Sequence, residues 1–385
     1  MREVVIVEAV RTPLGRRNGV LSGVHPVNLA ALVLREVVHR AGLEPGAVEQ
    51  VVLGCVSQVG EQGANVARNA VLAAGYPIEV PATSVDFQCG SSQQALHLAA
   101  GLIQAGVCDV AIAAGVESMT RVPMGVSVAN GPGQPYPPEL LARYELTSQG
   151  IAAEKIADRW GITREEADRF AAASQQKAAR ARDEGRFDRE IVPVEVELEG
   201  VQTTVTQDEG IRPGTTPEIL ATLKPSFREQ GVHHAGNSSQ ITDGAAAVLL
   251  MAVERAQALG LRPRARIVAQ AVVGSDPELM LTGPITATPK VLERAGLALA
   301  DLDLIEINEA FASVVLAWER ELRPDMAKVN VNGGAIALGH PLGATGARLV
   351  TTLLHELERR GGQYGLVTMC CGGGLGTATV IERLD

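Results

Sequence analysis

Residues 85–115 read VDFQCGSSQQALHLAAGLIQAGVCDVAIAAG, and this stretch decides the fold class of the chain. It begins in a short β-rich run and continues through a helical stretch with apolar residues at 95, 96, 99, 102 and 103. It ends in a second apolar run, DVAIAAG. A strand, a helix and a strand in this order form the crossover unit of a parallel sheet. We therefore expect an α/β fold.

The last part of the chain repeats this order. VNVNGGAIALGHPLGATG, from residue 329, leads into the helical ARLVTTLLHELERRG and then into the strand YGLVTMCC. Short β-rich runs alternate with helical stretches in residues 1–118 and again from about 274 to the end. We interpret this pattern as an internal duplication that produces two similar βαβαβ-type halves.

The segment between the halves has a different character. Residues 119–249 start with the Pro- and Gly-rich PMGVSVANGPGQPYPPEL and continue with amphipathic helices, one of which should start at a capping box of Thr163 and Glu166. We expect this segment to be an insertion that lies over the sheets. The expected domains are 1–118 plus about 250–273 for the N-terminal half, 119–249 for the insertion, and 274–385 for the C-terminal half.

Charge and composition narrow the class of partner. A formal net charge of -10 argues against nucleic acid or an anionic membrane as the main partner, because both need an extended basic face. The first residues, MREVVIVEAVRTP, read as a strand rather than a signal peptide, and no apolar run reaches about 18 residues. We expect a cytoplasmic protein without a membrane span.

The cysteines predict reduced thiols. Five cysteines are an odd set in a long chain without an export signal, which disfavours a disulfide framework. No CxxC pair accompanies clustered histidines, so we expect no structural zinc and no other bound metal. The five are Cys55, Cys89, Cys108, Cys370 and Cys371.

Two stretches carry residues suited to nucleophilic catalysis. Cys89 stands between a strand and a helix start, where free N–H groups and the helix dipole favour a thiolate. His340 is held between Gly339 and Pro341 in a glycine-rich loop, and such a rigid loop fixes an imidazole as a base or oxyanion donor. Either residue alone is also compatible with a buried small side chain or a turn. A phosphate cradle is disfavoured because the Walker lysine and GxGxxG are missing.

Three further stretches complete the set. Asn308 opens NEAFA after an apolar strand, and AGNSSQITDGA at 235–245 reads as a loop. TMCCGGGLG at 368–376 places two cysteines against three glycines, which let the backbone approach a ligand closely. Because the carboxyl ends of parallel strands share one edge of a sheet, Asn308 and both cysteine stretches are expected to converge.

Together these five stretches resemble the thiolase family, in the right order and over essentially the whole chain. The resembling motifs are QCGSS, GNSS, NEAF, GGAIALGHPLG and CCGGG. The resemblance implies the thiolase fold, a layered αβαβα core of two similar halves with a large loop-domain insertion. It also implies an acyltransferase that cleaves 3-ketoacyl-CoA with CoA, or runs the reverse condensation, through an acyl-cysteine intermediate.

The resemblance also implies roles for single residues. Cys89, activated by His340, is the nucleophile that carries the acyl group, and Cys370 is the acid/base cysteine. One oxyanion site consists of His340 and a water held by Asn308. The second consists of the backbone N–H groups of Cys89 and Gly372. Cys371 fills the variable position of the motif.

Coenzyme A enters as a co-substrate, with no permanently bound cofactor. The resemblance places Ser239 on the pantetheine and Arg212 near the adenine and phosphates, with Lys224 and Arg228 adding positive charge. It further implies a homodimer or homotetramer that pairs through sheet edges next to the nucleophile loop.

The chain departs from the family pattern at three places. Asp86 stands where Asn is common, and Ser92 where Gly is common. Leu146–Gly150, LTSQG, replaces the His-Met-Gly turn of short-chain biosynthetic members, which favours a degradative enzyme with a broader range, including bulky or steroid-derived chains. Two rival hypotheses are a silent thiolase-like CoA- or lipid-binding protein and a ketoacyl synthase. The first usually loses part of the Cys–His–Cys set, and the second would lack Cys370.

Overall fold

The strands of the main sheet run in the order β10-β11-β12-β9-β1-β8-β5-β3-β4, with β2 beside β8. This computed structural model describes residues 2–129 and 131–384. The strands are β1 (Val4–Arg11), β2 (Gly15–Arg16), β3 (Gln50–Gly54), β4 (Ala82–Val85), β5 (Val110–Ser118), β6 (Val194–Leu198), β7 (Val201–Val205), β8 (Thr242–Ala252), β9 (Ala265–Gly274), β10 (Leu304–Ile307), β11 (Tyr364–Cys371) and β12 (Leu375–Arg383). The helices are α1 (Pro26–Ala41), α2 (Val66–Ala73), α3 (Ser91–Gln104), α4 (Val126–Ala129), α5 (Pro138–Leu141), α6 (Gln149–Trp160), α7 (Arg164–Asp183), α8 (Pro217–Ala221), α9 (Val253–Ala258), α10 (Gly283–Ala295), α11 (Ala312–Leu322), α12 (Ala335–Leu338) and α13 (Thr345–Arg360).

The two halves of the sheet have matching topology. In the N-terminal half β4, β3 and β5 are parallel, and β8 and β1 follow in antiparallel pairing. In the C-terminal half β10 and β11 are parallel, β12 and β9 follow antiparallel, and a parallel bridge between Ile305 and Val329 takes the place of β4. The α3 and α13 helices occupy equivalent crossovers. The expected pair of similar halves is confirmed.

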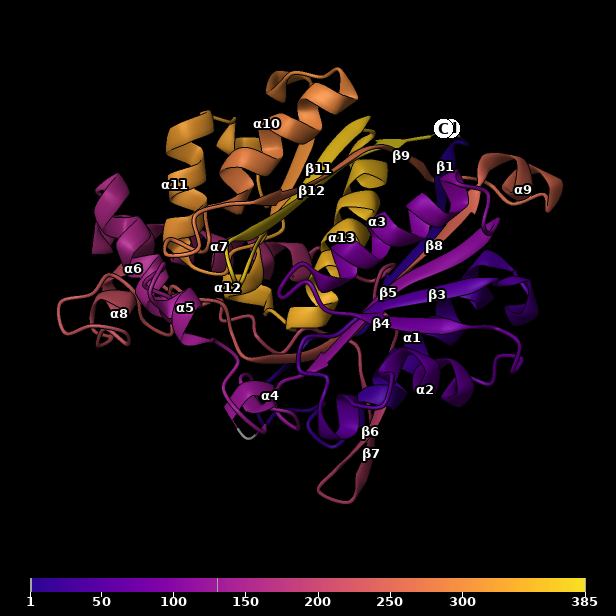
Figure 1. Cartoon of the computed structure of the whole chain (residues 1–385), viewed down its shortest axis with the longest axis horizontal. Helices are drawn as coiled ribbons and strands as arrows, with labels where there is room; N and C mark the ends of the chain where they lie inside the picture. The colour runs from indigo at the N-terminus through magenta and orange to yellow at the C-terminus, as the bar shows by residue number, and fades with distance from the viewer. Residues whose placement is uncertain (1, 130, 385) are drawn as a thin grey trace.

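The helices form three layers around the two halves of the sheet (Figure 1). The central pair, α3 and α13, packs against β5 and β8 on one side and against β11 and β12 on the other. The outer layers are α1 with α2 over the N-terminal half and α10 with α11 over the C-terminal half. The layered αβαβα arrangement is therefore confirmed.

The strands at the ends of the insertion differ from the expected boundaries. Residues 242–249, expected in the insertion, form most of β8 and pair with β1 and β5. The β9 strand, expected mainly with the N-terminal half, pairs along its length with β12 and through only two residue pairs with β1. The division into three domains stays a prediction, and its expected boundaries fall within β8 and at the end of β9.

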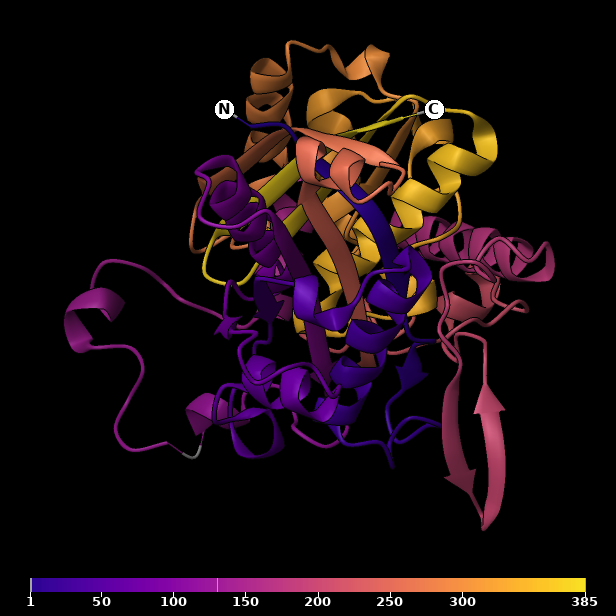
Figure 2. The same cartoon turned by 90° about the vertical axis from the view of Figure 1, so that its right-hand side faces the viewer.

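The insertion covers the sheets through long helices and extended segments. Its α7 helix starts at the expected capping box, in which Thr163 Oγ1 accepts from the N–H of Glu166 and the Glu166 carboxylate accepts from the N–H of Thr163. Figure 2 shows the hairpin of β6 and β7, and the segment that carries α5, projecting from the layered body.

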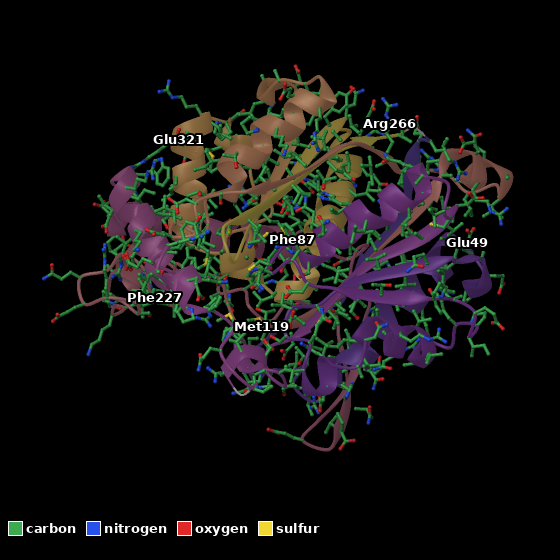
Figure 3. All side chains as sticks on the ribbon, viewed as in Figure 1. Glu49, Phe87, Met119, Phe227, Arg266 and Glu321 are labelled. Carbon is green, nitrogen blue, oxygen red and sulfur yellow. The ribbon has the colours of Figure 1, made fainter. Side chains whose placement is uncertain are left out.

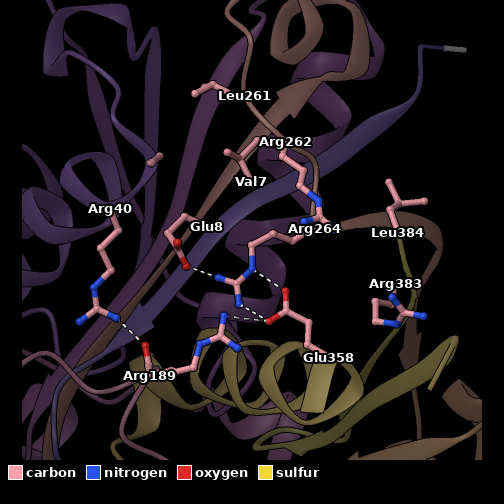
Figure 4. Close-up of a pocket in the computed structure, with 11 residues that line it drawn as sticks. Val7, Glu8, Arg40, Arg189, Leu261, Arg262, Arg264, Glu358, Arg383 and Leu384 are labelled. Carbon is pink, nitrogen blue, oxygen red and sulfur yellow. Dashed lines mark hydrogen bonds and ion pairs between the residues drawn. The ribbon is translucent and has the colours of Figure 1, made fainter. Parts of the chain in front are cut away.

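An ion-pair network braces the halves where β1 and β9 separate (Figure 4). Arg264, just before β9, is held between Glu8 on β1 and Glu358 on α13, with 2.7 Å between its Nε and Glu358 Oε1. Arg189 also reaches Glu358, at 3.3 Å. These groups line a cavity of about 520 Å³. The carboxylates already engage Arg189 and Arg264, so we interpret the network as structural.

Candidate active site

Cys89 lies between β4 and α3, buried with 2% of its surface exposed. The preceding residue, Gln88, has a positive φ of 50°, an uncommon conformation for a side chain other than glycine, and it turns the chain sharply into the helix. A Cβ on the following Gly90 would meet Cys371 Sγ at 2.6 Å. A tight turn and a close neighbour therefore hold the thiol of Cys89 at the start of α3.

Burial and hydrogen bonds act in opposite directions on this thiol. Burial raises the pKa of Cys89 to about 11, although the backbone N–H groups of Gly372 and of Cys89 itself, and then Gln149, favour the thiolate and oppose the rise in pKa. The Nε2 atom of Gln149 lies 4.0 Å from the sulfur. The resting side chain is therefore a thiol, and its ionisation needs a nearby base.

His340 is a neutral base with a defined tautomer. Its Nδ1 lies 2.6 Å from Thr345 Oγ1, and the Thr345 hydroxyl donates in turn to the carbonyl of Pro341 at 2.8 Å. Because that hydroxyl hydrogen is already engaged, we assign the imidazole proton to Nδ1 and the lone pair to Nε2. Burial, and then Arg348, lowers the pKa of His340 to about 3, so the ring is uncharged at neutral pH.

Asn308 follows β10 and borders the imidazole. Its Nδ2 lies 3.4 Å from His340 Nε2. Its buried Oδ1 has no hydrogen-bond partner among residues 2–129 and 131–384. The next residue, Glu309, accepts from Ser174, Asn330 and the N–H of Ile336, and so ties the loop before His340 to this strand end. The N–H of Asn308 also donates to the carbonyl of Thr368 on β11 at 3.1 Å, so Asn308 and the stretch of Cys370 meet at neighbouring strand ends.

The adjacent cysteines point to opposite faces of β11. Cys370 belongs to the apolar cluster of Phe311 and Met280, whereas Cys371 packs in the central cluster that also contains Cys89. Burial, and then the neighbouring Cys89, raises the pKa of the Cys370 thiol, and the same two causes raise that of Cys371. Both thiols are therefore protonated at rest and close to Cys89.

The glycine triplet forms the turn from β11 to β12. Gly373 and Gly374 have φ values of +78° and +77°, which side chains rarely adopt, and a Cβ on Gly374 would meet Ser275 O at 2.7 Å. This turn directs the N–H of Gly372 toward Cys89. The backbone conformation alone therefore requires glycine at 373 and 374. The close approach of this backbone to a ligand, expected from the sequence, is a second reason for glycine here.

A cavity of about 750 Å³ lies over these groups and includes His340, Gln149 and Gly372 in its lining. Ser239 also lines it, but Arg212 does not: its side chain is exposed at the surface of the insertion. Figure 3 labels Met119 and Phe227, which both belong to the expected insertion and line this cavity together with Gly372, in the turn after β11. The cavity therefore extends from the sheet to the insertion.

Sequence reasoning missed three residues around the site. Gln149, at the start of α6, contacts the Cys89 sulfur. From the sequence, its stretch LTSQG was recognised only as a departure from the family pattern. Thr345 sets the imidazole tautomer of His340. The one signal in the sequence was its position in the loop that follows His340. Glu117 at the end of β5 accepts from the N–H groups of Val56, Ser57 and Gly343, which holds the loop after His340 in place.

The two departures near Cys89 shape the nucleophile turn. Asp86 Oδ1 accepts from the N–H of Gln88 at 2.7 Å, a local turn that Asn also forms. Ser92 Oγ accepts from the N–H of Ala347 at 2.9 Å and links the two central helices. Neither side chain hydrogen-bonds to Cys89.

No metal site is evident in residues 2–129 and 131–384, where no group of three or more His, Cys, Asp and Glu side chains is placed to hold an ion. No helix within the same ranges is both long enough and apolar enough to cross a membrane.

Comparisons with known proteins agree with this arrangement. The family model of the thiolase N-terminal domain matches residues 4–254, and that of the thiolase C-terminal domain matches residues 261–383. A steroid 3-ketoacyl-CoA thiolase of Mycobacterium tuberculosis is 48% identical over 100% of this chain and 95% of its own. A 3-ketoacyl-CoA thiolase of Bacillus subtilis is 47% identical over 99% and 100%. A beta-ketoadipyl-CoA thiolase of Escherichia coli is 47% identical over 100% of both chains.

Solved structures give the same result. The Bacillus anthracis acetyl-CoA acetyltransferase superposes with a TM-score of 0.92 at 43% identity, covering 100% of this chain and 99% of its own. Human mitochondrial 3-ketoacyl-CoA thiolase gives 0.91 at 38% identity, with the same coverage. The protein is therefore an acyltransferase that uses CoA as a substrate and needs no permanent cofactor. The chain belongs to the thiolase family.

Its reaction is the thiolytic cleavage of a 3-ketoacyl-CoA, or the reverse condensation. The rival hypotheses of a silent CoA-binding protein and a ketoacyl synthase are not favoured.

Proposed function

We propose that Cys89 is the nucleophile and His340 its base. The Nε2 atom of His340 takes the thiol proton, and the sulfur attacks the keto carbon of a 3-ketoacyl-CoA. The bond between C2 and C3 then breaks, and the acyl group stays on Cys89. The departing acetyl-CoA carbanion takes a proton from Cys370. The observation that carries this assignment is the tautomer of His340, whose Nδ1 is engaged by Thr345 and whose Nε2 is left as the acceptor.

Two oxyanion sites stabilise the charges that develop. The N–H groups of Cys89 and Gly372 both interact with the Cys89 sulfur, so an oxygen on the attacked carbon would lie within their reach. Protonated His340 and a water held by Asn308 Oδ1 would stabilise the thioester oxygen. Each good donor in such a site lowers the barrier by about 3 kcal/mol.

The second half-reaction reverses the roles. The Cys370 thiolate takes the proton of an incoming CoA thiol, and the CoA sulfur collects the acyl group from Cys89. We place the pantetheine along Ser239, which lines the cavity, and the CoA phosphates near the exposed Arg212. These two placements rest on the resemblance of their motifs to those of the family.

We propose a degradative enzyme of lipid breakdown by β-oxidation. The support is the LTSQG turn, where Gln149 contacts Cys89, and the roomy cavity of about 750 Å³. The relatives named above include thiolases for steroid-derived and ketoadipyl substrates. All five cysteines are free thiols, which supports a reducing, cytoplasmic location.

A homodimer, or a pair of dimers, is the proposed assembly. The β4 strand ends the sheet and pairs only with β3 among the strands that the structure describes. Beside it lies a groove of about 350 Å³ between β3, β4 and α3, where the apolar Val52, Val85 and Leu98 lie among polar residues such as Gln50 and His97. A second copy pairing here would cover both the open strand edge and the groove.

Intact-protein mass spectrometry tests the proposed nucleophile. Mixing the protein with acetoacetyl-CoA, or with a longer 3-ketoacyl-CoA, should add one acyl mass that peptide mapping places on Cys89. Cys89→Ala should gain no acyl mass and should lose both thiolysis and the reverse condensation. Cys108→Ala should behave as the parent chain. An acyl group mapped to Cys55, Cys108 or Cys371 would overturn the assignment.

A further inference from the structure

One ionic side chain in the active-site cavity is left unused by the proposed mechanism. Among the lining residues, all within the described part of the chain, Arg17 is the single Arg, Lys, Asp or Glu. Its guanidinium has no hydrogen bond or ion pair with any residue of 2–129 or 131–384. The neighbouring Arg16 is instead paired with Glu209, at 2.8 Å between Nε and Oε1. An unpaired guanidinium in a concave site offers a fork of N–H donors that fits a carboxylate or phosphate.

The phosphates of CoA have other cations available. Arg212 and Lys224 are exposed in the insertion, and neither side chain has an ionic partner in the ranges that the structure describes. Arg212 follows Gly210, whose carbonyl accepts from Gln240, the residue next to Ser239. Lys224 follows Leu223, whose Cδ1 would lie 2.9 Å from a Cβ on Gly236 in the loop of Ser239. Both cations are thus near the loop along which the proposed function places the pantetheine.

Arg17 is also linked to the part of the cavity wall near Met119. The N–H of the next residue, Asn18, donates to Thr120 Oγ1 at 3.0 Å. Thr120 follows Met119, which packs in the apolar cluster that contains Cys89. A chain attached to Cys89 would therefore run along Met119 toward Arg17.

We propose that the preferred acyl group ends in a carboxylate, which Arg17 binds. This inference rests on the proposed function, because it takes the acyl group to be attached at Cys89. Met119 and Leu342, both buried in the cavity wall, would contact the methylenes, and the guanidinium would pair with the terminal anion. Arg17 is exposed, so a neutral chain leaves it hydrated at little cost. The result is a preference for carboxylate-ended chains and not an exclusion of neutral ones.

Binding to the full-length Cys89→Ala chain tests the proposal without turnover. Calorimetry would compare adipyl-CoA with hexanoyl-CoA, which has the same chain length and a methyl end. We expect adipyl-CoA to bind about tenfold more tightly, as a hydrogen-bonded charge pair provides. Adding Arg17→Met should remove this preference, Arg17→Lys should keep part of it, and Arg16→Met should keep it in full. The preference should also weaken as ionic strength rises.

Thiolysis provides the second readout. With Cys89 present, 3-oxoadipyl-CoA should have a kcat/KM about tenfold above that of 3-oxohexanoyl-CoA, and Arg17→Met should bring the two values together. Equal binding of both ligands to Cys89→Ala would overturn the inference. So would an equal loss of affinity for both ligands, and for free CoA, in Arg17→Met, because that result assigns Arg17 to a CoA phosphate. Failure of the proposed function would be recognised separately, as absence of an acyl group on Cys89 with either substrate.

Discussion

At the scale of residues, the face of β11 on which a cysteine lies decides whether its thiol can transfer a proton to the substrate. Side chains alternate between the faces of a strand, so Cys370 and Cys371 cannot share one environment. Cys370 faces the apolar cluster of Phe311 and Met280, two residues that line the active-site cavity. Cys371 faces the central helices and packs against Gly90. The two thiols are equally buried, and their direction distinguishes them.

Alanine substitutions should separate the two cysteines. Cys370→Ala should reduce thiolysis by about 100- to 10,000-fold, the usual effect of losing a general acid or base, while Cys89 still accepts an acyl group from a simple acyl-CoA. Cys371→Ala should stay within a few-fold, because only packing changes. Steady-state rates and melting temperatures of both variants provide the measurement. Comparable losses, or a larger loss for Cys371→Ala, would contradict the assignment of Cys370.

The raised pKa of Cys89 predicts how the free enzyme reacts with alkylating reagents. Because burial raises this pKa to about 11, the thiolate fraction without substrate should increase roughly tenfold per pH unit between pH 7 and pH 10. Inactivation by iodoacetamide should follow that slope without a plateau, with Cys89→Ala reporting the background from the other thiols. A plateau below pH 9 would show an ordinary or lowered pKa instead.

At the scale of elements, a buried arginine fastens the insertion to the first strand. Arg11, the last residue of β1, is fully buried, and its Nε lies 2.6 Å from a carboxylate oxygen of Glu190. Its two terminal nitrogens bind Asp208 at 2.7 and 2.9 Å. Asp208 also accepts from the N–H of Leu14. Two distant parts of the insertion thus meet at one side chain of the sheet.

Removing this arginine should cost far more than removing an exposed one. Arg11→Met leaves two buried carboxylates without their cation, and loss of one partner of a buried pair typically lowers the free energy of unfolding by about 3 to 5 kcal/mol. Urea unfolding of the variant measures the change. Arg169→Met serves as the control, because Arg169 is exposed and its one ion pair within residues 2–129 and 131–384 is with Glu165 on the same helix. A loss below about 1 kcal/mol for Arg11→Met would mean that the triad does not stabilise the fold.

At the scale of the whole molecule, the site exists only because the two halves face each other. Cys89 comes from the crossover of the N-terminal half, and His340 comes from the equivalent crossover of the C-terminal half. Asn308 and Cys370 lie at the ends of the parallel strands β10 and β11. Gln149 enters from the insertion. None of these parts holds a complete set alone.

The open edge at β4 predicts that two copies of the chain pair there. Leu98 on α3 is 41% exposed and lines the groove beside β4. Leu98→Asp should place a charge in the proposed contact and shift the protein toward monomers in analytical ultracentrifugation. Leu259→Asp is the matched control, because Leu259 has a similar exposure of 36% after α9. A monomeric parent chain with full activity, or equal behaviour of the two variants, would contradict a dimer at this edge.

Local patterns in the sequence were sufficient to predict the fold class and the two halves, and its short motifs indicated the candidate site residues, which stay predictions. Strand-helix-strand order depends on periodicities within about 30 residues, and the motifs around Cys89 and His340 are themselves short. The capping box at Thr163 was equally readable, because both of its partners lie within one helical turn.

Only the tertiary structure decided the contacts between segments far apart in the chain. Gln149 lies 60 positions from Cys89 in sequence and reaches its sulfur because α6 packs over the sheet. The β9 strand joins β12 rather than following the boundary read from composition, because strand pairing depends on packing and not on local pattern. The lack of an ionic partner for Arg17 in the part of the chain that the structure describes is likewise invisible in the sequence, where Arg17 looks the same as the paired Arg16 beside it. A side chain's partners are set by the folded surface around it, and a sequence lists only its neighbours along the chain.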